Sequence, residues 1–354
     1  MSSIVERFIK ATDDWAALAI GISVNGNEYL KVKENKFLSL KDEYCIVKAG
    51  NAWADLKQDL LIKKFMELKN DENIFCAGLN WPCITTQHKL LKLKDIKNDM
   101  FLYFAISYWH GINDEAKISV WYRMKNERAI YKSVMTNKCI TNDMQNRRFV
   151  DLKNDEWIYK AGKDWKGVTD DSKRKQFKEL KDDEWIYYAG KDWTGIAPED
   201  LNRKILEIKD EQWIYLAGKN WTDLSKTSKE QSFLRLKNIK YIIQSASDWT
   251  NISSKYIALK LLSNPYLYTI ENYPEKEISC IKNKIKNIPP EEENELIMDI
   301  QEMIIENEIN LPEFIDNYPH FRKIFINSMS DNFITQLDAL CNNYKSVYLL
   351  SNIT

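Results

Sequence analysis

Residues 156–165 read Glu-Trp-Ile-Tyr-Lys-Ala-Gly-Lys-Asp-Trp, and residues 184–193 read Glu-Trp-Ile-Tyr-Tyr-Ala-Gly-Lys-Asp-Trp. The segments begin 28 residues apart, and a lysine repeats at this spacing without a gap, at Lys41, Lys69, Lys97, Lys125, Lys153, Lys181, Lys209 and Lys237. A tryptophan column keeps the same register and is broken only at Asn137; it holds Trp53, Trp81, Trp109, Trp165, Trp193, Trp221 and Trp249. A fixed period of this length indicates stacked supersecondary units. Eight repeats can be written, from Phe37 to about Lys260.

Each repeat has the pattern of two helices. The apolar positions from Ile158 to Trp165 follow the i, i+3, i+4, i+7 spacing of one helical face. Asn154 or the equivalent Asp suits the N-cap of this helix, and the acidic residue after it suits the positive end of the helix dipole. Phe177 and Leu180 indicate a preceding helix that ends near the lysine column. Two helices of roughly ten to twelve residues with short turns fill the repeat.

A continuous coiled coil is the alternative, because 28 is also four heptads. The apolar positions change phase at the Lys-Asx step, and Gly162, Gly167 and Pro198 would weaken or break a long helix. The Ala-Gly pair is better explained as the place where a neighbouring helix packs closely against the tryptophan. The sequence therefore predicts an all-α fold, an α-solenoid of about eight 28-residue helix-turn-helix repeats.

The ends of the chain depart from the repeat. Residues 1–36 are expected to form an N-terminal capping repeat, with a tight turn at Asn25-Gly26, because the end of a solenoid must cover its last apolar face. The solenoid is assigned to residues 37–264. After Asn264-Pro265 the register is lost, and residues 265–354 are expected to form a C-terminal helical cap or domain. In general architecture the chain resembles the α-solenoids, such as the HEAT, armadillo and tetratricopeptide arrays, although its repeat length differs from theirs.

Composition points to a folded, soluble protein. The 354 residues are 44% hydrophobic and 12% aromatic, which is enough for a core. No apolar run reaches the roughly 18–20 residues of a membrane span, and the first residues lack the apolar stretch of a signal peptide. The six cysteines include no Cys-x-x-Cys pair, which favours a reduced setting, either the cytoplasm or a host cytosol.

Charge is uneven although the formal net charge is −1. Residues 116–150 carry eight basic and two acidic side chains, whereas residues 289–316 carry ten acidic and no basic ones. Solvated helix faces explain both runs, and selection of a charged partner is the functional alternative. The basic strip falls in the third and fourth repeats, where the consensus is lost. Drift in a tolerant repeat is one reading and a dedicated partner-binding site is the other, with these candidate residues: Trp109, His110, Trp121, Tyr122, Arg123, Arg128, Arg147 and Arg148.

The lysine column also has two interpretations. Equally spaced lysines can follow the phosphates of a nucleic acid laid along the solenoid. The structural interpretation is preferred at this point: each lysine complements the carbonyl end of a helix, and the acid two residues later in a neighbouring repeat pairs with it.

Signals of catalysis are nearly absent, with no Gly-rich phosphate loop, no His-Glu-x-x-His, no Gly-x-Ser-x-Gly and no Cys/His cluster of metal spacing. No cofactor, metal or catalytic residue is assigned. The predicted function is a non-enzymatic scaffold for protein–protein interaction, with no membrane insertion. The alternative is a nucleic-acid-binding repeat protein that uses the strip at 117–148, and an enzyme acting on nucleic acid stays a third, less favoured reading.

Overall fold

The computed structural model describes residues 3–24, 26, 29–53, 55–264, 266–286, 288–305 and 311–351. Helices are the only regular elements within these ranges, which confirms the all-α class. Asn25 and Pro265, which belong to the predicted turn and domain boundary, lie outside them. The chain divides into two compact bodies, an N-terminal body of residues Met1–Val168 and a C-terminal body of residues Thr169–Thr354. The three predicted segments stay a prediction, and the boundary at residue 36 falls inside a helix.

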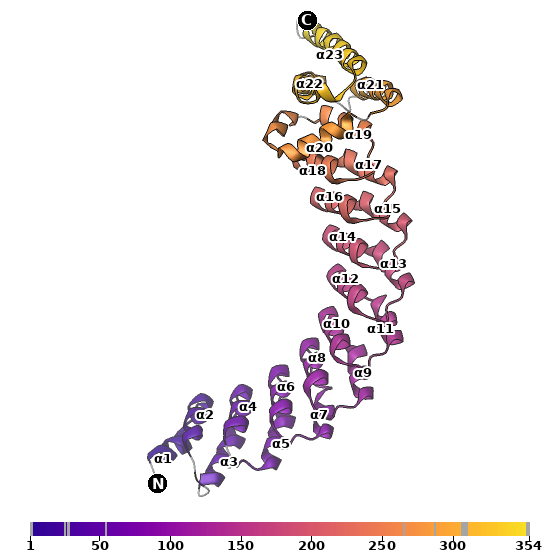
Figure 1. The fold of residues 1–354 in the computed structure, drawn as a ribbon. Helices are drawn as coiled ribbons and strands as arrows, with labels where there is room; N and C mark the ends of the chain where they lie inside the picture. Colours follow the sequence, from indigo (N-terminus) through magenta and orange to yellow (C-terminus); the bar gives the residue numbers. More distant parts are fainter. Residues whose placement is uncertain are drawn as a thin grey trace. The chain divides into compact units, whose positions relative to one another are not determined.

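The N-terminal body is built from helix pairs. We call the odd-numbered member of each pair the A helix and the even-numbered member the B helix, and Figure 1 shows the two kinds in separate rows. The A helices are α1 (Ser3–Lys10), α3 (Leu30–Ser39), α5 (Gln58–Glu67), α7 (Thr86–Lys92), α9 (Asp114–Arg123) and α11 (Asn142–Phe149). The B helices are α2 (Asp14–Ser23), α4 (Glu43–Ala52), α6 (Asp71–Asn80), α8 (Asp99–Tyr108), α10 (Glu127–Thr136) and α12 (Asp155–Asp164).

The C-terminal body continues the pairs and then departs from them (Figure 1). Its A helices are α13 (Asp170–Glu179), α15 (Pro198–Glu207), α17 (Lys226–Arg235) and α19 (Ser254–Leu262), and its B helices are α14 (Asp183–Asp192), α16 (Glu211–Asn220) and α18 (Ile239–Asp248). Six further elements follow: η2 (Leu267–Asn272), α20 (Glu275–Ile285), α21 (Pro290–Ile305), α22 (Leu311–Phe325), η3 (Ile326–Ser328) and α23 (Asp331–Ser351). The two helices of a pair run in opposite directions, so each body has two edges. We call the edge with the A-to-B turns the lysine edge and the edge with the B-to-A loops the loop edge.

The Asx column starts the B helices, as predicted. In each of the eight repeats an Asn or Asp side chain accepts a hydrogen bond from a backbone N–H in the first turn, at Asp42, Asn70, Asn98, Asn126, Asn154, Asp182, Asp210 and Asn238. Helix starts otherwise leave such N–H groups without a partner. The sequence of each repeat therefore specifies where its B helix begins and where the short turn before it ends.

The acid after the Asx column joins one repeat to the next. The carboxylate of Asp71 accepts hydrogen bonds from the backbone N–H groups of Lys97 at 3.0 Å and Asn98 at 2.6 Å. The same contact with the turn of the following repeat is made by Asp14, Glu43, Asp99, Glu127 and Asp183, and Glu211 accepts one such bond, from the backbone N–H of Asn238. The prediction that this acid pairs with a lysine ammonium group is wrong, because the hydrogen-bond donor is the backbone N–H of the lysine and not its side chain.

Glycine and tryptophan set the spacing of the B helices. A Cβ atom on Gly78 would lie 2.6 Å from two atoms of the Trp109 indole, closer than real Cβ atoms come. The same approach brings together Gly21 and Trp53, Gly50 and Trp81, Gly190 and Trp221, and Gly218 and Trp249. The predicted role of the Ala-Gly pair is confirmed, since only a residue without a side chain lets the next indole pack on the helix backbone.

A buried cation in the A helix caps the A helix before it. Lys64 Nζ donates to the carbonyl oxygen of Leu40 at 2.9 Å, and Leu40 is the C-cap of α3. Lys92, Arg148 and Lys204 do the same for the C-caps Leu68, Met124 and Leu180. Where this position holds Val120 or Ser232, an arginine three residues later reaches the C-cap instead, as Arg123 to Leu93 and Arg235 to Ile208. These cations satisfy carbonyl groups at the negative pole of the helix dipole.

Candidate functional site

The stacking pattern is interrupted between α8 and α10. The glycine position is taken by Ile106, which is buried, and the tryptophan position of the next repeat is taken by Asn137. The Asn137 side chain donates to the hydroxyl oxygen of Ser107 at 3.2 Å and to that of Thr136 at 3.0 Å. A glycine and the indole it accommodates are thus lost together, and a small polar network takes the place of the indole.

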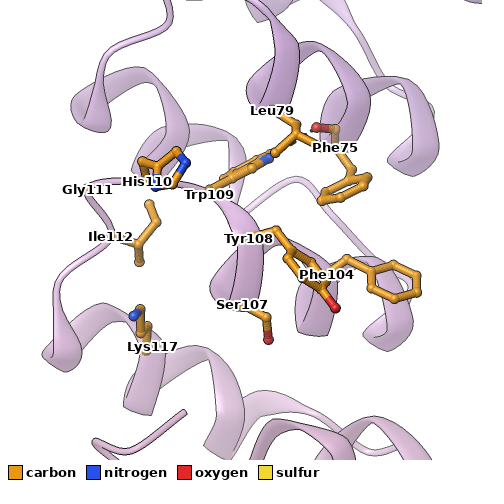
Figure 2. A pocket seen from close by; sticks show the side chains of 10 residues that line it. All are labelled: Phe75, Leu79, Phe104, Ser107, Tyr108, Trp109, His110, Gly111, Ile112 and Lys117. Atoms are coloured by element: carbon orange, nitrogen blue, oxygen red, sulfur yellow. Dashed lines mark hydrogen bonds between the residues drawn. The ribbon is translucent and has the colours of Figure 1, made fainter. Parts of the chain in front are cut away.

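Beside this interruption, the loop edge carries an open pocket of about 730 Å³. It lies at the ends of α6 and α8, along the loop that follows α8 and against the first half of α9. Its lining consists of Phe75, Leu79, Phe104, Ser107, Tyr108, Trp109, His110, Gly111, Ile112 and Lys117. Figure 2 shows the rings of Phe75, Phe104 and Tyr108 on one side of the space, and His110, Ile112 and Lys117 on the other.

The aromatic side of the pocket is a packed cluster that stays open to solvent. The ring centroids of Phe75 and Phe104 lie 5.7 Å apart, and those of Phe104 and Tyr108 lie 6.3 Å apart. Phe75 also stacks on Trp109 with an interplanar angle of 11°. Tyr108 is 50% exposed and Leu79 is 43% exposed. The cluster presents a rigid apolar surface because its rings restrain one another while their outer faces contact water.

The opposite side is held by the loop that follows α8. Gly111 has a φ angle of +84°, and a Cβ atom there would lie 2.2 Å from the Thr86 hydroxyl oxygen, so this turn requires glycine. Lys89 Nζ reaches the carbonyl oxygen of His110 at 3.4 Å. Burial lowers the pKa of Lys89. Lys117 adds an ammonium group at the pocket, so a cation lies opposite the aromatic cluster.

The polar groups in the pocket lining, from Ser107, Tyr108, His110 and Lys117, can form hydrogen bonds or ion pairs with a bound ligand. Ser107 shares a 3.1 Å hydrogen bond with Thr136, and burial raises the pKa of Tyr103 beneath, with hydrogen bonding to Tyr108 raising it further. In the described part of the chain no three His, Cys, Asp or Glu side chains are placed to hold a metal ion. A mostly aromatic pocket with a few hydroxyl, imidazole and ammonium groups fits an apolar side chain with an acid next to it.

The structure places the predicted site residues in three settings. Trp109 forms a wall of the pocket at 3% exposure and His110 lies at its rim. Trp121 is fully buried and its indole N–H donates to the carbonyl oxygen of Ile130, so it belongs to the core. Tyr122 is exposed and packs on Trp121, with ring centroids 4.9 Å apart.

The four arginines also have different roles. Arg123 and Arg148 donate to the carbonyl groups of Leu93 and Met124 and so hold neighbouring A helices together. Arg147 forms a 2.9 Å ion pair with Asp143, in which both side chains are largely exposed. Arg128 is exposed on α10. The helix directions place Lys117 and Lys138 toward the loop edge and Lys125 on the lysine edge. The basic strip is therefore distributed around the body and is not gathered on one edge.

Sequence analysis missed Phe75, Leu79, Phe104 and Tyr108. A signal was present in the register, because Tyr108 is the one aromatic residue in a column that otherwise holds Ala52, Asn80, Thr136, Asp164, Asp192, Asn220 and Asp248. Leu79 likewise stands where the near-consensus repeats carry Lys163, Lys191 and Lys219. An apolar residue in a column of exposed polar residues marks a surface that the repeat itself does not need.

Comparison of the sequence with protein-family models and with curated proteins gives no match. Within the described ranges, no helix is both long and apolar enough to cross a membrane. The architecture is that of a helical-repeat protein.

Proposed function

We propose that this chain is a non-enzymatic helical-repeat scaffold that binds an extended segment of a partner protein at the pocket between α6, α8 and α9. The observation that carries this proposal is the partly exposed aromatic cluster of Phe75, Phe104 and Tyr108 opposite Lys117, in which Tyr108 is 50% exposed. Exposed rings held in a rigid arrangement are typical anchors of protein interfaces.

Charge specifies the partner further. The N-terminal body carries 27 Lys and Arg against 22 Asp and Glu, a net charge of +5. Lys117 is the charged side chain of the pocket lining, and no carboxylate belongs to that lining. The segment that fits best has a large apolar side chain for the aromatic cluster and an acidic residue beside it for Lys117.

The proposal is tested with a displayed library of random linear peptides selected against the full chain. We expect the selected peptides to share an apolar residue followed or preceded by Asp or Glu. Binding of one synthetic consensus peptide is then compared between the parent and Tyr108→Ala, and a loss of at least about tenfold in affinity is expected for an anchor residue. Lys117→Glu should weaken the same peptide.

Tyr44→Ala is the matched control. Tyr44 is a tyrosine on another B helix with similar exposure, 45% against 50%, and it lies outside the pocket lining. Its replacement should leave the affinity unchanged. Selection of no peptide above the level of an unrelated helical protein, or equal binding by parent and Tyr108→Ala, would contradict the proposed site.

A further inference from the structure

The lysine edge of the N-terminal body presents a row of exposed ammonium groups. The row consists of Lys41, Lys69, Lys97, Lys125 and Lys153. All five side chains are exposed, and in the described part of the chain none has a carboxylate within 4.0 Å of its Nζ. Evenly spaced cations of this kind call for a physical explanation.

Direct ion pairing with neighbouring acids is not the explanation. The acids that follow the Asx column in the repeat before each lysine are Asp14, Glu43, Asp71, Asp99 and Glu127. Each of these carboxylates accepts hydrogen bonds from the backbone N–H groups of the next turn, as Asp99 does from Lys125 and Asn126. The acids satisfy the main chain and leave the lysine side chains directed to solvent.

Complementing the helix dipole is not the explanation either. The carbonyl groups at the C-termini of α3, α5, α7 and α9 are already contacted by the cations of Lys64, Lys92, Arg123 and Arg148. A second cation at each helix end adds little, because the dipole effect of an exposed charge is about 0.3–1 kcal/mol and is screened by salt.

The lysine column, of which the row is the N-terminal part, borders a pocket in each body. In the N-terminal body a pocket of about 750 Å³ has four lysines in its lining: Lys69, Lys92, Lys94 and Lys97. In the C-terminal body a pocket of about 520 Å³ has four cations in its lining: Lys209, Arg235, Lys237 and Lys260. Lys69 and Lys97 correspond in the register to Lys209 and Lys237, so the lysine column contributes two cations to each pocket.

The carboxylates in these linings, Glu67 and Asp95 in the first and Glu211 in the second, are fewer than the cations and cancel them only in part. Asp95 pairs with Lys92 at 2.9 Å, and Glu211 accepts a hydrogen bond from the backbone N–H of Asn238. Burial lowers the pKa of Lys260, and the proximity of Lys237 lowers it further although Glu211 opposes this. Cations that repel one another around an open space favour the entry of an anion.

We propose that the lysine edge of the N-terminal body binds the phosphodiester backbone of a nucleic acid, with a phosphate group at the lysine of each successive repeat. A nucleic acid is the linear polymer whose charge repeats regularly, and it matches a row of single cations. An anionic membrane presents a plane of charge that a single row of lysines does not match. The proposal concerns the edge opposite to the peptide pocket and does not depend on that pocket, and the row shares only Lys125 with the strip at 117–148.

The test uses the full chain and two fourfold variants that remove the same charge. The edge variant carries Lys69→Ala, Lys97→Ala, Lys125→Ala and Lys153→Ala. The control variant carries Lys31→Ala, Lys48→Ala, Lys138→Ala and Lys166→Ala, at exposed lysines of the same body that lie toward the loop edge. Circular dichroism before and after heating confirms that both variants are folded.

The probes are a fluorescein-labelled oligothymidine, a labelled duplex of mixed sequence, and vesicles of phosphatidylcholine with phosphatidylserine. Affinity is measured by anisotropy over a series of salt concentrations. Each phosphate contact contributes about −0.7 to the slope of log K against log salt for a single strand and about −0.9 for a duplex. We expect the edge variant to lose about 3 from the single-strand slope, and the control variant to keep the slope of the parent.

Three results would overturn the proposal. The first is no binding of either oligonucleotide by the parent at low salt. The second is an equal loss in the edge and control variants, which would mean that net charge alone drives binding. The third is vesicle binding that depends on the edge lysines while oligonucleotide binding does not, which would assign the row to a membrane surface.

Discussion

Gly190 in α14 and Trp221 at the end of α16 share one packing site: a Cβ atom on Gly190 would lie 2.5 Å from Cε2 and Cζ2 of the indole. Between α8 and α10 the same two positions hold Ile106 and Asn137. Here the large apolar residue stands at the glycine position instead of the tryptophan position. Ile106 is buried, and no indole occupies the paired position. The equivalent positions between α10 and α12 hold Val134 and Trp165, so a smaller branched residue is found together with the indole, whereas isoleucine is found only where the indole is lost.

This relationship predicts coupling between the two residues. Gly190→Ile should destabilise the protein by about 1–3 kcal/mol or more through overpacking. Trp221→Asn should cost about 3–5 kcal/mol through the cavity it leaves. The loss in the free energy of unfolding of the double variant, measured with urea, should be smaller than the sum of the two single losses by about 0.5–3 kcal/mol. Gly50→Ile combined with Trp221→Asn joins residues of different bodies and should be additive. Additivity in the first pair would show that the two residues do not share a site.

The bond from Asp71 to the next turn should be measurable as stability. Asp71→Ala removes the acceptor of the Lys97 and Asn98 N–H groups. Because the bonds are charge-assisted but half-exposed, we expect a loss of about 1–3 kcal/mol in the free energy of unfolding. Glu72→Ala changes the adjacent exposed acid and should stay within about 0.5 kcal/mol of the parent. If Asp71→Ala and Glu72→Ala lower the free energy of unfolding by the same small amount, water replaces the Asp71 carboxylate as acceptor without loss of stability.

The two adjacent arginines of α11, Arg147 and Arg148, should differ sharply in their contributions to the stability of the fold. Arg148→Ala leaves the carbonyl of Met124 without its cation and removes a half-buried side chain, so a loss of about 1–3 kcal/mol is expected. Arg147→Ala breaks an exposed ion pair with Asp143 and should change stability by less than about 1 kcal/mol. Urea midpoints of the two variants decide the matter. If the urea midpoint of Arg148→Ala equals that of the parent, the hydrogen bond from Arg148 to Met124 does not contribute to stability.

Acid should weaken the contact between α16 and α18. Burial raises the pKa of the Asp248 carboxyl, but hydrogen bonds from Lys219 at 2.7 Å and Tyr215 at 2.6 Å outweigh burial, and the pKa is lowered overall. A lowered folded-state pKa gives stability that is present above the unfolded value of about 3.9 and is lost as pH falls through the folded value. The side chains are partly exposed, so the contribution is about 0.5–1 kcal/mol.

The measurement compares parent and Asp248→Asn by urea unfolding at neutral and at acidic pH. The difference in stability should be present near pH 7 and should shrink below about pH 4. Asp223→Asn, an exposed aspartate in the loop between α16 and α17, should show no such dependence. A difference that persists unchanged in acid would mean that Asp248 acts through packing and not through its charge.

The repeat architecture was predictable because its determinants are local. Asn154 begins α12 as an N-cap, and the apolar face from Ile158 to Trp165 packs inward, since capping and helical periodicity depend on residues close in sequence. The close approach of glycine and tryptophan was also predictable, because a residue without a side chain on a packed helix face admits a large side chain from the neighbouring helix. The sequence thus determined the helices, their caps and turns, and the fact that they stack.

The tertiary structure alone decided which atoms meet across neighbouring repeats. Asp71 binds the main chain of Lys97 and not its ammonium group, and Arg148 faces a carbonyl group and not a partner, because helix directions set where a long side chain ends. The pocket at Tyr108 likewise needs α6, α8 and α9 together, and no segment of sequence contains it. Local pattern determined what each repeat is, and the distances between repeats decided which of its charges and rings remain for a ligand.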